Sequence, residues 1–157
     1  MKVYFLRHGD AGDPNAWQGD DAERPLSAEG RGRTALEGRA LADLRLKLDV
    51  MLTSPLLRAS QTANLVAKAL KLDVQEDERI VNLDTRKLQG ILRDHRSADA
   101  IMLVGHEPSM SETISRVIGG GELDLKKGGL ACFELPDADS LQGRLLWLIP
   151  PKVLSEK

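Results

Sequence analysis

Apolar residues along the chain gather in short runs, separated by stretches in which they recur every three or four residues. Three runs, 2–6, 49–53 and 100–104, have the unbroken hydrophobicity of strands that are covered on both faces. Each run precedes a polar turn and a segment with helical periodicity. Because strands that alternate with helices pair in parallel, the pattern predicts a three-layer α/β/α sandwich with a mostly parallel central sheet.

Two helices are expected after the first two strands. A polar loop over 9–25 precedes Ser27, which is expected to cap the first helix. Ser54 and Pro55 are expected to begin the second helix, as its N-cap and its first helical position. The apolar stripe expected to face the core in the first helix consists of Leu36, Ala40, Leu44 and Leu48.

The second half of the chain continues the alternation and ends in two strands. A short strand near Val74 and a helix over 85–95 lead to the third buried run, and a further helix ends at three glycines, 119–121. The apolar segments 130–135 and 144–149 predict an antiparallel hairpin at an edge of the sheet. With no repeat or linker, residues 1–157 are expected to form one domain.

Composition narrows the classes of function. The 22 Lys and Arg residues nearly balance the 24 Asp and Glu residues, and no block of one sign indicates nucleic-acid or membrane binding. Cys132 is the single cysteine, so it has no disulfide partner within the chain. With neither a secretory signal nor a bilayer-length apolar span, we expect a soluble, cytoplasmic monomer.

Candidate chemistry lies where the predicted strands end. Arg7 and His8 follow the first strand, Arg58 lies one turn into the helix after the second, and His106 follows the third. Because the carboxyl ends of parallel strands share one edge of a sheet, these side chains are expected to converge there. Two helix N-termini, at 54–55 and 107–108, would face the same crevice and favour an anion.

The converging residues predict a phosphate site with a nucleophile. At an effective dielectric constant near 20, a cation about 4 Å from a unit negative charge contributes roughly 4 kcal/mol, so Arg7 and Arg58 together could hold a phosphoryl group. The same cations disfavour protonation of His8 and leave its imidazole able to attack. A histidine at a strand end is often only structural, but two of them beside two arginines favour a functional site.

Four segments, in this combination and order, resemble the histidine phosphatase superfamily, which includes the phosphoglycerate mutases, and within it the small SixA-type phosphohistidine phosphatases. The segments cover most of the chain: 4–11 with Arg-His-Gly, 24–31 with Arg-Pro-Leu-Ser, 53–63 with Ser-Pro-Leu-Leu-Arg, and 104–108 with Gly-His-Glu-Pro. The resemblance implies a phosphoglycerate mutase-like fold and a metal-independent phosphatase without a cofactor. It also implies that His8 is phosphorylated, that Arg7 and Arg58 clamp the phosphoryl oxygens, and that His106 stabilises the group in transit.

The general acid is left open. Mutase-type members place a glutamate after the strand that follows the Arg58-type helix, but segment 78–83 has no convincing equivalent. The candidates in this chain are Glu107, Asp10, Asp21 and Glu23. A phosphorylated imidazole can take a proton from solvent and leave as neutral imidazole, whereas an alkoxide needs a positioned donor. Without a strong acid, the site is therefore expected to prefer P–N bonds.

The expected partner is a phosphohistidine-containing protein. One alternative is a phosphatase of the same superfamily for small sugar or nucleotide phosphates. A second is a non-catalytic module that binds phosphate or a phosphoprotein. A metallohydrolase using His8, His106 and Asp10 is disfavoured because the neighbouring arginines would repel a cation.

Overall fold

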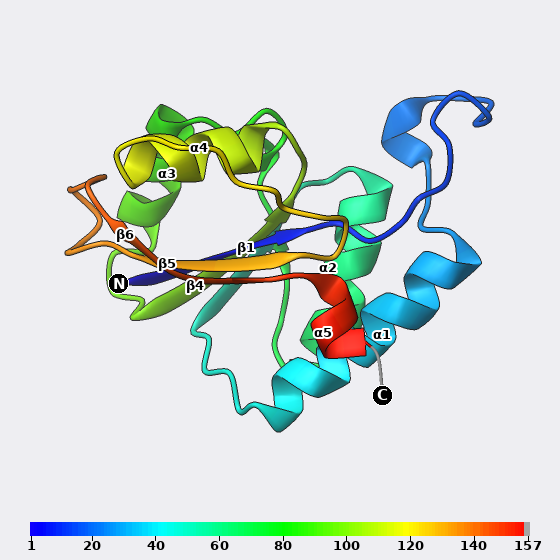
Figure 1. Ribbon diagram of the computed structural model, residues 1–157, viewed down its shortest axis with the longest axis horizontal. Coiled ribbons are helices and arrows are strands. Elements are labelled where there is room, and N and C mark those ends of the chain that lie inside the picture. The colour runs from blue at the N-terminus through cyan, green and yellow to red at the C-terminus, as the bar shows by residue number, and fades with distance from the viewer. Residues whose placement is uncertain (156–157) are drawn as a thin grey trace.

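The computed structural model describes residues 1–155 and contains a six-stranded sheet in the order β3-β2-β4-β1-β5-β6 (Figure 1). The strands are β1 (Lys2–Arg7), β2 (Val50–Thr53), β3 (Gln75–Glu76), β4 (Ala100–Gly105), β5 (Leu130–Glu134) and β6 (Arg144–Ile149). The first four of these are parallel, and β5 and β6 form an antiparallel hairpin that ends the sheet. The predicted mostly parallel sheet with an antiparallel edge is therefore confirmed.

Helices cover both faces of the sheet, which makes the predicted three layers (Figure 1). They are α1 (Ala28–Asp43), α2 (Leu57–Leu70), α3 (Thr85–Asp94), α4 (Ser109–Val117) and α5 (Pro151–Ser155), with short 3-10 turns at Asp21–Glu23 and Glu78–Ile80. Because side chains alternate along a strand, β1 serves both layers. Val3 and Phe5 join a core with α3 and α4, whereas Tyr4 and Leu6 join a second core with α1 and α2.

The face that α1 buries is not the predicted one. The helix ends at Asp43, so Leu44 and Leu48 of the expected stripe lie outside it, and Leu44 is 63% exposed. Within the helix, Glu37 and Leu41 are buried. Helix α1 packs chiefly on α2, and a Cβ on Gly38 would lie only 3.2 Å from the Cα of Val66. The absence of a side chain at Gly38 therefore allows α1 and α2 to approach each other closely.

The start of α2 also differs from the prediction. The helix begins at Leu57 with Leu56 as its N-cap, so Ser54 and Pro55 lie before it. The Oγ of Ser54 accepts a hydrogen bond from the backbone N–H of Leu56 (3.2 Å) in the turn between β2 and α2. The short helix α5 was not expected, and no helix within residues 1–155 is long and apolar enough to cross a membrane.

Candidate active site

The carboxyl ends of β1 and β4 lie side by side and bring the two strand-end histidines together. Arg7 pairs with Gly105 in the parallel register, and the backbone N–H of His8 donates to the carbonyl of Gly105 (3.0 Å). The imidazole rings of His8 and His106 are 5.3 Å apart between centroids, although 98 positions separate them in the chain. The topology thus places two imidazoles at one edge of the sheet.

His8 is buried and oriented by its own turn. Its Nδ1 lies 2.7 Å from the carbonyl oxygen of Gly9, which can only accept, so Nδ1 carries the ring hydrogen and Nε2 keeps its lone pair. Burial lowers the pKa of His8 to about 3, with smaller contributions from His106, Arg58 and Arg7. From the sequence, the charges of the two arginines are expected to keep the imidazole neutral, whereas loss of solvent is the larger cause.

His106 is oriented by Ser54, a contact that sequence reasoning missed because it assigned Ser54 to helix capping. The Nε2 of His106 lies 2.7 Å from the Oγ of Ser54, which already accepts from Leu56. Donation from the hydroxyl to Nε2 leaves the ring hydrogen on Nδ1. Burial, followed by the charge of Arg58, lowers the pKa of His106 to about 4, so the ring is a neutral N–H donor.

Both arginines are anchored through their terminal nitrogens. In Arg58, Nη1 donates to the carbonyl of Asp21 (2.8 Å) and Nη2 to its carboxylate (3.0 Å). In Arg7, Nη1 donates to the carbonyl of Leu125 (2.9 Å). The positive charges of both residues act on His8 and His106, because each contributes to lowering the pKa of the two imidazoles.

Three buried nitrogens of this cluster have no hydrogen-bond partner within the described residues: Nε of Arg7, Nε of Arg58 and Nδ1 of His106. An unsatisfied buried polar group costs about 1–3 kcal/mol, and more when it is charged. These three N–H groups, near the neutral His8, could donate to the oxygens of a bound oxyanion.

The four candidate acids are held in other interactions or lie exposed. The carboxylate of Asp10 accepts from Ser27 (2.6 Å) and pairs with Lys127 (3.3 Å); both contacts lower the pKa of Asp10. Hydrogen bonds and charge from Arg24 and Arg58 lower the pKa of Asp21.

Glu107 caps its own helix, since its carboxylate accepts from the backbone N–H of Ser111 (2.9 Å). This bond uses one backbone N–H group at the N-terminus of α4, where the sequence predicts an anion. Glu23 lies exposed in the loop before α1. No group of three His, Cys, Asp or Glu side chains within residues 1–155 is placed to hold a metal ion.

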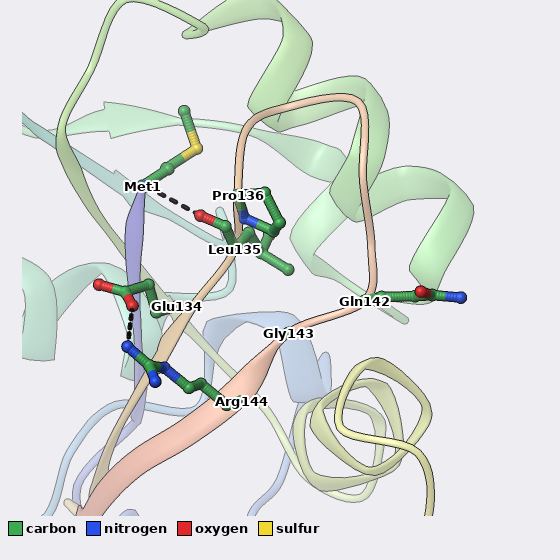
Figure 2. A pocket seen from close by; sticks show the side chains of 7 residues that line it. All are labelled: Met1, Glu134, Leu135, Pro136, Gln142, Gly143 and Arg144. Atoms are coloured by element: carbon green, nitrogen blue, oxygen red, sulfur yellow. Dashed lines mark hydrogen bonds and ion pairs between the residues drawn. The ribbon is translucent and has the colours of Figure 1, made fainter.

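An open pocket of about 490 Å³ adjoins the cluster and includes Arg58 and His106 in its lining. Leu56, Val81 and Leu83 give it apolar walls. A second pocket, of about 510 Å³, lies at the opposite edge around Met1, whose amino group donates to the carbonyl of Leu135 (2.9 Å) (Figure 2). That pocket has no histidine among its lining residues.

Comparison with known proteins shows the family to which the chain belongs. Residues 3–113 match the model of the histidine phosphatase superfamily (branch 1), and the chain belongs to that superfamily. It is therefore a phosphatase of the phosphoglycerate mutase-like fold. Its relatives include an uncharacterized protein of Picosynechococcus sp., 37% identical over 137 residues, which are 83% of this chain and 82% of that protein.

The resemblance extends to the SixA type. The phosphohistidine phosphatase SixA of Escherichia coli is 36% identical over 72 residues, which are 46% of this chain and 43% of that protein. The structure of the protein histidine phosphatase SixA complexed with tungstate matches with a TM-score of 0.86 over 98% of this chain and 99% of that chain, at 23% identity. The α-ribazole phosphatase of Shigella flexneri has the same fold, with a TM-score of 0.74, 18% identity and coverage of 96% and 97%.

Proposed function

We propose that the protein hydrolyses phosphohistidine in proteins through a covalent intermediate on His8. The observation that carries this proposal is the set of three unpartnered buried N–H groups, on Arg7, Arg58 and His106, beside the free Nε2 of His8. A phosphoryl group has three equatorial oxygens whose charge needs donors that are already in place. The three N–H groups equal the three equatorial oxygens in number, and each can donate to one of them.

In the first step, the lone pair on Nε2 of His8 attacks the phosphorus of the substrate. A new P–N bond forms as the bond from phosphorus to the substrate nitrogen breaks, and its electron pair stays with the departing imidazole. Arg7, Arg58 and the Nδ1–H of His106 donate to the equatorial oxygens as they carry the charge of the transition state. The substrate imidazole, protonated by solvent on its other nitrogen, departs neutral.

In the second step, water attacks the phosphorus of the phosphorylated His8. The P–Nε2 bond breaks and returns its electron pair to the ring, while the proton of water passes to phosphate or solvent. Since burial keeps the pKa of His8 at about 3, the free enzyme returns to a neutral imidazole at physiological pH. No further residue has to change its protonation state.

The contacts of the candidate acids support P–N bonds over ordinary esters. Asp10 and Asp21 have lowered pKa values, and the carboxylate of Glu107 caps α4. An alkoxide leaving group needs a proton from a positioned acid, whereas imidazole does not. A site with these carboxylates therefore discriminates by the leaving group.

The test measures the rate of hydrolysis of four substrates: a phosphohistidine protein, phosphoimidazole, a sugar phosphate and a nucleotide. Each is assayed with wild type, His8→Ala and His95→Ala. His95 follows α3 away from the cluster and is the matched control for loss of a histidine. We expect phosphohistidine to be hydrolysed at least about 100-fold faster than the esters and only His8→Ala to abolish turnover. Faster turnover of a sugar or nucleotide phosphate would assign the protein to small-molecule substrates, and binding without turnover would make it a binding module.

A further inference from the structure

The pocket beside Arg58 and His106 has three carboxylates around it, which we call the acidic mouth: Asp21, Glu107 and Glu112. Asp21 begins the 3-10 turn Asp21–Glu23, whereas Glu107 lies two residues before α4 and Glu112 lies in the first turn of α4. Arg58 is the single cation that lines this pocket, and it is 8% exposed. The site therefore combines a positive floor with a negative entrance.

The three carboxylates differ in how far they are neutralised. Asp21 pairs with Arg24 and Arg58, and Glu107 accepts the backbone N–H of Ser111. Glu112 lies exposed one turn along α4 and takes part in none of the ion pairs found within residues 1–155. Its charge is therefore available to a ligand that enters the pocket.

Arg58, whose terminal nitrogens pair with Asp21, lies at the floor of the same pocket. Nε of Arg58 is buried and without a partner, so the floor holds an unused charged donor. A ligand that suits both parts has its negative phosphoryl group at the floor and positive charge outside it. A small substrate with a second phosphate or a carboxylate would place that group against the acidic mouth and be repelled.

We propose that the acidic mouth selects phosphohistidine in protein segments that carry Lys or Arg next to the phosphorylated residue. The inference rests on the proposed function and specifies its substrate class. The walls formed by Leu56, Val81 and Leu83 contact the apolar part of the entering segment, and Glu112 attracts its cationic side chains. Charges at the rim of an interface act mainly on association, so the selection appears in kcat/KM.

The first experiment compares three peptides with one phosphohistidine each, phosphorylated with phosphoramidate and flanked by two Lys, two Ala or two Glu residues. At low ionic strength we expect kcat/KM to fall in the order Lys, Ala, Glu, with a span of about 10-fold between the first and the last. At 0.5 M NaCl the span should shrink to about 2-fold because salt screens exposed charges. Two results would overturn the inference. One is a span of kcat/KM between the Lys and Glu peptides that does not shrink at high salt, and the other is equal kcat/KM for the three peptides.

The second experiment changes the mouth and uses the ratio of the Lys peptide to the Glu peptide, which does not depend on the active fraction of a variant. Glu112→Gln should lower this ratio about 3-fold, and Glu112→Lys should bring it to one or below. Asp43→Asn, at the far end of α1, removes an exposed carboxylate outside the mouth and should leave the ratio unchanged. A ratio that Glu112→Lys does not lower would contradict the assignment of Glu112.

Hydrolysis of phosphoimidazole, which carries no flanking residues, separates this inference from the function on which it rests. If wild type cleaves phosphoimidazole but treats the three peptides alike, the selectivity is wrong and the proposed function stands. If wild type cleaves neither phosphoimidazole nor any peptide, the proposed function itself fails.

Discussion

Glu37 is a buried acid, and its burial should make the free energy of unfolding depend on pH. Its side chain lies between α1 and the loop that ends at β5, where the residue is 2% exposed and its Oε2 has no hydrogen-bond partner within the described residues. A Cβ on Gly128 would lie 2.6 Å from Oε1 of Glu37, so the loop packs directly on the carboxyl group. The backbone N–H of Gly128 in turn donates to the carbonyls of Arg7 (3.1 Å) and His8 (3.0 Å).

Burial raises the pKa of Glu37 from 4.5 to about 8, against a small opposing effect of the charge on Arg33. The unfolded chain therefore loses this proton several pH units before the folded protein does. Below pH 4.5 the carboxyl is protonated in both states and the folded protein has its full stability. As the pH rises towards 8, ionisation of the unfolded chain lowers the free energy of unfolding. Linkage between these two pKa values lowers the free energy of unfolding by about 2–3 kcal/mol from pH 5 to pH 7.

Glu37→Gln keeps the shape of the protonated side chain and replaces the carboxyl group by an amide that does not ionise. We expect the stability of the variant relative to wild type to rise by about 2–3 kcal/mol from pH 5 to pH 7. For a domain of this size, that difference corresponds to about 5–10 °C in Tm. Urea unfolding at half-unit steps from pH 5 to pH 8 measures it directly.

His8 and His106 also titrate in the folding equilibrium, but both variant and wild type contain them, so the difference between the two curves isolates Glu37. Glu29→Gln is the matched control, since Glu29 lies exposed on the same helix and pairs with Arg33 (2.9 Å). Glu29→Gln should not raise the free energy of unfolding at pH 7 as Glu37→Gln does. A Glu37→Gln variant that follows the wild-type curve at every pH would show that Glu37 is not held protonated by burial.

Further predictions concern the site itself. In ¹⁵N NMR titrations, His8 and His106 should remain neutral down to pH 5, because burial lowers their pKa values to about 3 and 4; an inflection near pH 6.5 would contradict this. Ser54→Ala should release the tautomer of His106, seen as a change in its ¹⁵N shifts, and lower kcat about 10-fold; an unchanged tautomer would refute the role of Ser54. Arg58→Ala should weaken binding of tungstate, a tetrahedral oxyanion, at least about 100-fold by calorimetry, whereas equal affinity would remove Arg58 from the anion site.

The arrangement of strands could be predicted from the sequence because it depends on strong local signals. Continuous apolar runs at 2–6 and 100–104 define buried strands, and parallel pairing leaves little choice about where their carboxyl ends lie. His8 and His106 thus come together as a consequence of topology. This is why two residues far apart in the chain could be assigned to one edge before any contact was known.

Features that depend on packing between helices could not be predicted in this way. The leucine spacing predicts a stripe that runs to Leu48, whereas α1 ends at Asp43 and packs closely on α2 at Gly38, a contact that the leucine pattern does not indicate. The local sequence around Ser54 predicts a helix cap, whereas its hydroxyl bonds to a histidine 52 positions away. The unusual environment of Glu37 is likewise invisible in a helix that otherwise exposes its charged residues.

The central claim is that Nε2 of His8 attacks phosphorus while neighbouring donors hold the phosphoryl oxygens. The most direct measurement is rapid-quench trapping of the enzyme during turnover of phosphoimidazole labelled with ³²P, followed by peptide mapping. The account predicts an acid-labile phosphate on the peptide that contains His8, formed at least as fast as turnover and absent in His8→Ala. Turnover by wild type without label on that peptide, or label retained in His8→Ala, would contradict it.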